Sequence, residues 1–370
     1  MSSKPRFDGE KVQLDQLCSK GKSTLRQKDV VNDGPYSVYG ASGIVGSMST
    51  YQNTNEYVAV VKDGAGVGRA NLCLGETSVL GTMQALIPKE NVLPEYLLHL
   101  VRSLRLGKGF SGSTIPHIYF KDYGKLEVAL VSLDKQRQIV SVLTTVESQL
   151  ETLRRQLALL DTLVKSRFVE MFGSSRFESC MMDDLVADIV SGTNVSGQQR
   201  PLEDSEYGVL RISAVTRGVF DSSEYKAVTD VTGINMIHPH KGDLLFSRAN
   251  TSEMVGATAI VDNDYDRLFL PDKLWRLDPA NKVETVFLKA LLSSPAIRAE
   301  MSKVSTGSSG SMQNISMAKF RKLPAFLPPL ALQQEFADFV ATVDKSRFVV
   351  QQQIDKLQTL YDSLAQEYFA

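Results

Sequence analysis

The sequence has 370 residues, of which 43% are hydrophobic, and a formal net charge of −1 at pH 7. Such a chain can bury large cores and suggests two or three domains, and its balanced charge argues against indiscriminate binding of polyanions. Cys18, Cys73 and Cys180 are scattered without metal-ligand spacing, which indicates a reduced, cytoplasmic protein without a structural metal. No apolar run approaches the roughly 20 residues of a membrane span.

The first predicted domain covers residues 1–132 and combines short strands with turns. The β-branched run Tyr57–Val61 predicts a strand, and the Asp63-Gly64 pair marks the turn after it. Residues 90–104 are typical of a helix, and residues 107–118 form a loop rich in glycine and serine. We predict a short strand at residues 125–130 that leads into a much longer helix.

A long helix is predicted from Leu133 to Phe172, within a spacer segment that covers residues 133–173. Apolar residues recur there in steps of three and four, which gives the narrow stripe that a helix buries against one partner helix. Ser132 is placed to cap the helix and Gly173 to end it. About 40 residues at about 1.5 Å each give a rod on the order of 60 Å long. The stripe includes Leu143, Leu150, Leu153 and Leu157.

The same plan occurs a second time, as a second domain at residues 174–329 and a second long helix at residues 330–370. A shift of 197 residues moves Leu133 onto Leu330 and Phe172 onto Phe369, and the apolar stripe reappears in the same phase. We therefore expect the two helices to pair in antiparallel fashion; the alternative is two unrelated amphipathic helices, each packed on its own domain. The second stripe includes Val343, Val350, Ile354 and Leu357.

The repeat extends into the domains, although the front half of the second one is longer. Arg248 corresponds to Lys62, and Asn314-Ile315 corresponds to His117-Ile118. The predicted fold class is therefore α+β: two similar mixed α/β domains, joined by two long helices that form an antiparallel coiled coil.

This order of domains and helices, with the paired loops GSTIPHI (residues 112–118) and GSMQNIS (residues 310–316), resembles the specificity (S) subunit of type I restriction–modification enzymes. The resemblance covers nearly the whole chain. It implies two target-recognition domains, each of which reads one half of a bipartite DNA site, and a coiled coil that sets the gap. It also implies two methyltransferase (modification) subunits docked on the coiled coil, and restriction (translocase/nuclease) subunits that join this complex. S-adenosylmethionine is then expected on the methyltransferase subunit, with no cofactor in this chain.

Candidate DNA-binding residues lie in the glycine- and serine-rich loops and around the glycine turns. Arginine, lysine, asparagine and small hydroxyl side chains read base edges or hold phosphates, and these loops carry them. Since the two domains differ in these residues, we expect unlike half-sites and an asymmetric target. The candidates are Lys62, Arg69, Arg105, Lys108, Ser111, Ser113, Thr114 and His117 in the first domain, and Arg248, Asn250, Lys273, Lys303, Ser308, Ser311 and Asn314 in the second.

Catalytic motifs are incomplete in this sequence. Gly21-Lys22-Ser23 resembles the end of a phosphate-binding loop, but glutamine stands at position 16 where that motif needs glycine. Pro271-Asp272 resembles the start of a nuclease motif without the acidic and lysine residues that should follow. These features favour a non-catalytic DNA-recognition subunit. Two alternatives are a cytoplasmic coiled-coil adaptor that never touches DNA and, less favoured, a self-contained methyltransferase.

Overall fold

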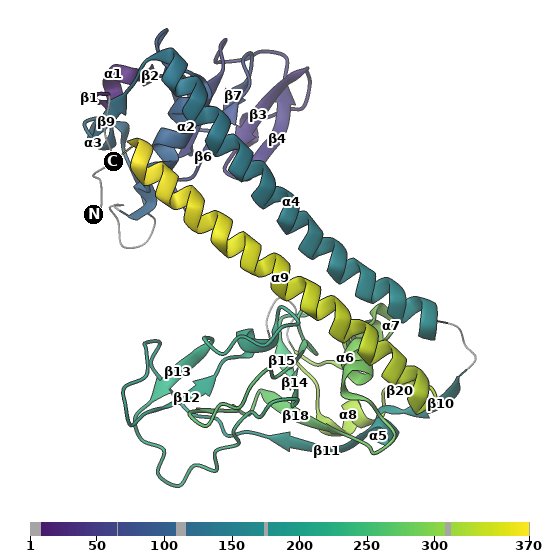
Figure 1. Ribbon diagram of the computed structural model, residues 1–370. Coiled ribbons are helices and arrows are strands. Elements are labelled where there is room, and N and C mark those ends of the chain that lie inside the picture. The colour runs from purple at the N-terminus through teal and green to yellow at the C-terminus, as the bar shows by residue number, and fades with distance from the viewer. Residues whose placement is uncertain (1–8, 65, 109–115, 174–176, 308–311, 370) are drawn as a thin grey trace. The chain divides into compact units, whose positions relative to one another are not determined.

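The computed structural model describes residues 9–64, 66–108, 116–173, 177–307 and 312–369, and the chain divides into two compact units (Figure 1). Unit 1 contains residues 1–156 and 350–370, and unit 2 contains residues 157–349. Each unit therefore holds one predicted domain, the start of one long helix and the end of the other. The spacer segments predicted as separate parts of the chain are thus shared between the two units.

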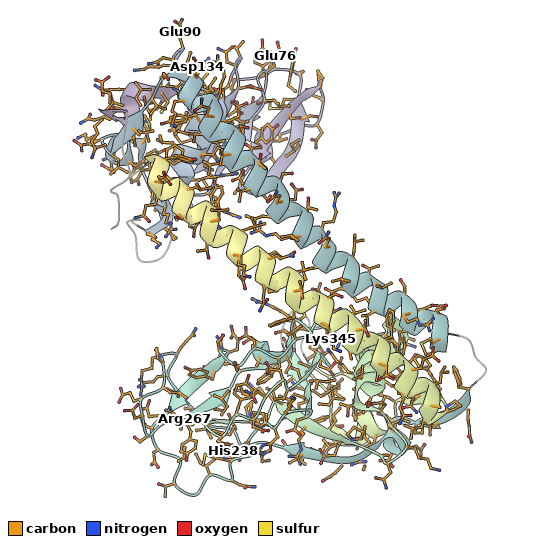
Figure 2. The ribbon with its side chains drawn as sticks, viewed as in Figure 1. Glu76, Glu90, Asp134, His238, Arg267 and Lys345 are labelled. Carbon is orange, nitrogen blue, oxygen red and sulfur yellow. The ribbon has the colours of Figure 1, made fainter. Side chains whose placement is uncertain are left out.

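The two long helices have the predicted bounds, α4 at Leu133–Phe172 and α9 at Leu330–Phe369. The Ser132 hydroxyl accepts a hydrogen bond from the backbone N–H of Lys135 at 3.4 Å, which makes it the predicted N-cap. At the other end, the Gly173 N–H donates to the Val169 carbonyl at 2.7 Å. Asp134 lies in the first turn of α4, where a carboxylate complements the positive end of the helix (Figure 2).

Unit 1 contains a four-stranded antiparallel sheet in the order β2-β8-β5-β6, a three-stranded sheet β4-β3-β7 and the pair β1-β9. Helix α2 packs on β6, β5 and β8 of the larger sheet. The elements are β1 Glu10–Gln13, α1 Leu14–Leu17, β2 Cys18–Lys20, η1 Gln27–Asp29, β3 Tyr36–Gly40, β4 Gly43–Met48, β5 Tyr57–Val61, β6 Ala70–Cys73, β7 Ser78–Val79, β8 Met83–Pro88, α2 Pro94–Ser103, η2 Leu106–Lys108, α3 Phe120–Tyr123 and β9 Glu127–Leu130.

Unit 2 contains a four-stranded sheet in the order β11-β18-β14-β16, a three-stranded sheet β13-β12-β17, and the pairs β10-β20 and β15-β19. Its elements are β10 Glu178–Met181, α5 Met182–Leu185, β11 Val186–Ser191, β12 Tyr207–Leu210, η3 Ile212–Val215, β13 Tyr225–Val228, β14 Leu244–Ser247, β15 Ala249–Asn250, β16 Thr258–Ile260, β17 Leu268–Phe269, β18 Leu274–Pro279, α6 Thr285–Ser293, α7 Pro295–Val304, β19 Gln313–Asn314, α8 Met317–Arg321 and β20 Pro324–Leu327.

The same topology in both units confirms the predicted duplication. Strand for strand, β2-β8-β5-β6 matches β11-β18-β14-β16, and the parallel pair β3-β7 matches β12-β17. The longer front half of the second domain is also confirmed. In unit 1 a tight turn at Ala41-Ser42 joins β3 to β4, whereas residues 211–224, which include η3, join β12 to β13.

The central strand of each larger sheet is buried on both faces, which explains its continuous apolar sequence. In β5, Val58 and Val60 face the core that α2 covers, while the alternate residues Tyr57, Ala59 and Val61 face a second core. In β14, Leu244 and Phe246 join the core that contains α6, and Leu245 joins another core. The period of two along a strand produces this division.

The ends of both long helices belong to the domain cores. In unit 2 the start of α9 and the end of α4 meet in an aromatic cluster, where Phe336 lies 5.6 Å from Phe168 and 5.5 Å from Phe172 between ring centroids. In unit 1 the Phe369 ring, near the end of α9, packs edge-on against Tyr96 at 5.4 Å. Ile139, at the start of α4, is 2% exposed in the same core. The core of each domain thus includes the start of the long helix that follows it and the end of the other long helix.

Within each unit the paired helix segments run antiparallel. In unit 1, Arg154 of α4 donates to Gln358 of α9 at 3.4 Å. In unit 2, ion pairs of 2.6 Å and 2.8 Å join Asp161 to Arg347 and Arg167 to Glu335. Of the predicted stripe residues, Leu143, Leu150, Val343 and Ile354 are buried, and Leu153, Leu157, Val350 and Leu357 are half-buried.

A buried glutamine holds the start of each long helix to its domain. Gln136 in α4 is 0% exposed; its side chain accepts from the Leu93 N–H at 2.8 Å and donates to the Asn91 and Val131 carbonyls at 2.8 and 2.9 Å. Gln333 in α9, also 0% exposed, accepts from the Glu284 N–H and donates to the Lys282 and Pro328 carbonyls. Because the amide oxygen and nitrogen of each glutamine are hydrogen-bonded, these bonds offset the cost of burying the side chain. Each glutamine thereby fixes the loop that precedes α2 or α6.

Candidate nucleic-acid interface

In unit 2 the residues that follow strand β14 pair with the residues that follow the glycine- and serine-rich loop. Strand β15 pairs with β19, so that Ala249 lies opposite Asn314 and Asn250 opposite Gln313. The Ile315 N–H donates to the Arg248 carbonyl at 2.9 Å. We call these joined segments, residues 248–250 and 313–315, the bridged edge of unit 2.

Unit 1 has an equivalent bridged edge, formed by residues 62–64 and 116–118. Asp63 lies opposite His117, and the Ile118 N–H donates to the Lys62 carbonyl at 3.0 Å. The Gly64 N–H donates to the Pro116 carbonyl at 3.1 Å. The structure thus confirms that Lys62 matches Arg248 and that His117 matches Asn314, and it places two predicted candidates side by side in each domain.

A glycine turn next to each bridged edge requires the absence of a side chain. Gly68 has φ of +84°, and a Cβ there would lie 2.2 Å from the Gly107 nitrogen. Gly256 has φ of +80°, and a Cβ there would lie 2.4 Å from the Met301 sulfur. Both glycine N–H groups donate back to the central strand, to Val61 at 2.8 Å and to Ser247 at 2.7 Å. The turns are therefore equivalent, and glycine permits both their backbone conformation and their close packing.

Arg248 is held by the aspartate that precedes Lys273. Its Nε donates to the Asp272 carbonyl at 2.8 Å and its Nη2 to Asp272 Oδ2 at 3.1 Å. The Arg248 N–H donates to the Lys273 carbonyl at 3.1 Å, so the two basic candidates are adjacent in space. Asn250 is only 7% exposed, and its side-chain oxygen accepts from the Thr251 N–H at 2.9 Å, which gives that side chain an internal role.

The bridged edge of unit 1 carries a histidine–carboxylate pair and an aromatic face. His117 Nδ1 lies 2.7 Å from Asp63 Oδ1, and the imidazole stacks on the Tyr119 ring with centroids 6.4 Å apart. Lys121 Nζ lies 5.4 Å from the centroid of the Tyr119 ring, which is half exposed. The bridged edge and the residues that follow it, Tyr119 and Lys121, thus present aromatic and cationic groups, which are suited to bases and phosphates.

Four other basic candidates are exposed. Arg69 follows the glycine turn, and Lys108 ends η2. Arg105 has φ of +47° and lies 3.4 Å from Asp362 near the end of α9, while Lys303 pairs with Glu300 at 2.6 Å. The hydroxyl candidates lie outside the described residues, namely Ser111, Ser113, Thr114, Ser308 and Ser311.

The acidic partners at the bridged edges were not among the predicted site residues. Asp63 and Asp272 orient His117 and Arg248, but a carboxylate has no donor for DNA and is therefore not predicted from donor chemistry. For Asp63 the Asp63-Gly64 turn was a local signal of its position. Asp272 was noted only within the Pro271-Asp272 pair, and no local pattern links it to Arg248, 24 residues earlier in the sequence.

A buried polar cluster fastens α2 to the long helices in unit 1. His99 is 2% exposed; its Nδ1 lies 3.1 Å from the Tyr361 hydroxyl and its Nε2 lies 3.5 Å from the Thr144 hydroxyl. Arg102, one turn later, donates to Glu147 at 2.8 Å. Burial lowers the pKa of His99, although the Glu147 carboxylate, 3.7 Å from Nδ1, opposes this shift. The contacts of His99 join α2 to α4 and α9.

The described part of the chain gives no sign of a metal centre or a membrane helix. Across residues 9–369, excluding the stretches that are not described, no group of three or more His, Cys, Asp or Glu residues is placed to hold a metal ion. Among the helices of these residues none is long and apolar enough to cross a membrane.

The type I restriction modification DNA specificity domain matches this chain over residues 8–161 and 186–359. These segments include both bridged edges and most of the long helices. The chain belongs to this family. Each matched segment contains one specificity domain, and both repeats of the fold are therefore accounted for by the same family.

Two curated relatives agree with this assignment. The chain is 25% identical over 191 residues to the type I restriction enzyme EcoEI specificity subunit of Escherichia coli; this covers 50% of the chain and 31% of the relative. It is 27% identical over 132 residues to the MjaVIII specificity subunit of Methanocaldococcus jannaschii, covering 34% of the chain and 30% of that relative. The chain thus spans about a third of the length of these relatives.

The fold is similar to that of a type I restriction–modification S subunit from M. genitalium, with a TM-score of 0.57 and 14% sequence identity. The similarity covers 100% of this chain and 98% of the other. Since that alignment extends over both units, the duplicated specificity-domain architecture is shared, although the sequences have diverged widely.

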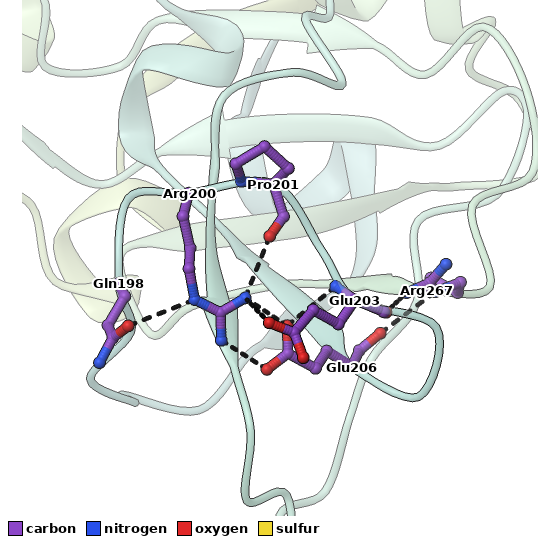
Figure 3. A network of polar contacts seen from close by, with 6 residues as sticks. All are labelled: Gln198, Arg200, Pro201, Glu203, Glu206 and Arg267. Atoms are coloured by element: carbon purple, nitrogen blue, oxygen red, sulfur yellow. Dashed lines mark hydrogen bonds and ion pairs between the residues drawn. The ribbon is translucent and has the colours of Figure 1, made fainter.

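In the second specificity domain an arginine–glutamate network ties the loop before β12 to the three-stranded sheet (Figure 3). Arg200 donates to the Glu206 carboxylate at 2.5 and 2.6 Å, and the Glu203 N–H donates to it at 3.0 Å. Arg267 donates to the backbone carbonyls of Glu203 and Glu206. The hydrogen bonds from Arg200 lower the pKa of Glu206 to about 2.

This network predicts an acid-sensitive contribution to the stability of the second specificity domain. The folded-state pKa of Glu206 lies below the value of about 4.3 for an unfolded chain, so its contribution is complete above that value and is lost as pH falls toward about 2. Glu206→Gln removes this contribution. Melting temperatures measured between pH 7 and pH 2 should show a larger gap between wild type and variant at pH 7 than at pH 2. Asp204→Asn, an exposed neighbour, serves as the control. Parallel curves for wild type and Glu206→Gln would contradict the prediction.

Proposed function

We propose that this chain is the DNA sequence-recognition subunit of a type I restriction–modification complex, in which each specificity domain reads one half of a bipartite, asymmetric site. The observation that carries the proposal is the duplicated bridged edge, because one scaffold presents different side chains at the same positions: Lys62 and His117 in one domain, Arg248 and Asn314 in the other. The family match over both domains supports DNA recognition and does not favour the adaptor alternative.

The long helices are proposed to set the gap between the half-sites and to dock two methyltransferase subunits, through which restriction subunits join the complex. A helix of 40 residues in each repeat supports a spacer role. Curated relatives are named as specificity subunits of type I restriction enzymes, which supports partners of this kind. The complex would then act on DNA in the cytoplasm.

We further propose that the chain is not catalytic and that S-adenosylmethionine binds only to the methyltransferase subunit. The incomplete catalytic motifs of the sequence support a chain that recognises DNA while a partner subunit carries out methylation. Titration of the purified chain with S-adenosylmethionine in a calorimeter should give no stoichiometric heat. Addition of the partner methyltransferase should then yield methylation of DNA that contains one bipartite sequence. Stoichiometric binding to the chain alone would contradict the cofactor assignment, and methylation without sequence preference would contradict the recognition role.

A further inference from the structure

The Arg248–Asp272 pair in the second specificity domain has a geometry that a structural ion pair does not require. Asp272 engages the Nε–H and one Nη2–H of the guanidinium, through its backbone carbonyl and its carboxylate Oδ2. An arginine has five N–H donors, so both Nη1 donors and one Nη2 donor remain. Among the described residues none of these three has a hydrogen-bond partner. One Nη1–H and the remaining Nη2–H lie side by side and form the outer edge of the guanidinium.

The surroundings fix both members of the pair. The Arg248 backbone donates to Lys273 and accepts from Ile315, so the arginine lies between the residue that precedes β18 and the segment that contains Ile315. The Asp272 carbonyl also accepts from the Ser191 hydroxyl at 3.4 Å. Both side chains are a little less than one-third exposed, at 28% and 29%. The guanidinium is therefore held in one plane while one edge remains accessible.

Asp272 Oδ1 is buried and has no hydrogen-bond partner among the described residues. A buried carboxylate oxygen without a partner costs stability, and few are found in native structures. The aspartate is therefore poorly explained as a stabilising element alone. Its one side-chain interaction is with Arg248, which indicates that orientation of the arginine is its main effect.

We infer that Arg248 reads a guanine in the half-site of the second domain and that Asp272 is its positioning residue. An arginine whose two terminal nitrogens are presented together matches the O6 and N7 acceptors of guanine in the major groove. The negative charge of Asp272 offsets that of Arg248, so a phosphate would gain little from this site, whereas a base edge carries no net charge. Lys273, next to the pair, forms no ion pair with a described residue, and its positive charge suits a phosphate of the DNA backbone. This inference rests on the proposed function and names one base pair of its target.

The first specificity domain has no equivalent of the Arg248–Asp272 pair. Its equivalent of Arg248 is Lys62, whose N–H donates to the Thr82 carbonyl at 3.0 Å as that of Arg248 donates to Lys273. Gly81 consequently stands in the position of Asp272, so no carboxylate is available there. A lysine ammonium is a point charge without the planar fork of arginine. The inferred guanine contact thus belongs to one half-site only.

The test is the methylated sequence in cells that produce the chain together with its partner methyltransferase. Arg248→Lys and Asp272→Asn should each relax the requirement for G·C at one position of the second half-site by about 10-fold, and leave the other positions unchanged. If Asp272 acts through Arg248, the double variant should equal Arg248→Lys alone. The control is Asp278→Asn, which removes the carboxylate of a similar pair in β18, bonded to Arg276 at 2.8 and 3.2 Å, and should leave the sequence unchanged.

Three outcomes would overturn the inference while leaving the proposed function intact. They are a second half-site without a G·C requirement, an unaltered base preference in Asp272→Asn, and an equal loss of methylation at all sites by an assembled, folded variant complex. The last would mean that the pair is structural. Absence of any bipartite methylated sequence with the wild-type chain would instead contradict the proposed function itself.

Discussion

Exchange of residues 174–329 for the second domain of another specificity subunit is expected to change one half of the methylated sequence completely and to leave the other half unaltered. Each specificity domain has its own sheets, its own buried core and its own bridged edge. Under the proposed function, the side chains of one edge should therefore read bases independently of those of the other. Methylation sequencing of cells that express the chimaera with the partner methyltransferase measures both half-sites in one experiment.

The reciprocal exchange of residues 1–132 is the matched control, because it should change the opposite half-site. The junctions must preserve Gln136 and Gln333, which hold the start of each helix to its domain. Simultaneous change of both half-sites in either chimaera would show that the domains do not read DNA independently. The modular interpretation would then be wrong even if the chain binds DNA.

Phe336→Ala is expected to lower the free energy of unfolding of unit 2 by about 3–5 kcal/mol. The Phe336 ring is 0% exposed and packs against Phe168 and Phe172 at angles of 70° and 79°. Phe287 of α6 completes the cluster, with its ring 5.0 Å from that of Phe172. Removal of Phe336 leaves a cavity at the point where α4, α9 and α6 meet. Chemical denaturation monitored by circular dichroism measures the loss.

Phe348→Ala provides the control on the same helix. Phe348 is 65% exposed, so its replacement should change the free energy of unfolding by no more than about 0.5 kcal/mol. The two variants remove the same side chain from the same kind of backbone and differ only in burial. Equal, small effects of both would mean that the end of α4 and the start of α9 are not packed into the domain core.

Several features of this protein could be predicted from its sequence. The helix bounds and the capping role of Ser132 followed from local apolar periodicity and cap chemistry. The match between His117 and Asn314 followed from the 197-residue register of the repeat, and the match between Lys62 and Arg248 followed from the apolar strands that precede them. These predictions succeeded because a helix or a buried strand shows its apolar pattern in consecutive residues. The repeat adds a second copy of each pattern, which can be compared with the first.

The tertiary structure alone decided which side chains meet. Gln136 binds the backbone of Asn91 and Leu93, and Arg248 binds Asp272; both sets of contacts join residues distant in sequence. Asn250 has a residue type suited to DNA, yet it is buried beside the bridged edge and bonds to its own loop. A hydrogen bond across such a distance depends on strand register and on the packing of helices against the sheet. Strand register and helix packing leave no pattern in the residues next to Arg248 or Gln136 in the sequence. The contacts of the bridged edges could therefore be seen only in the folded chain.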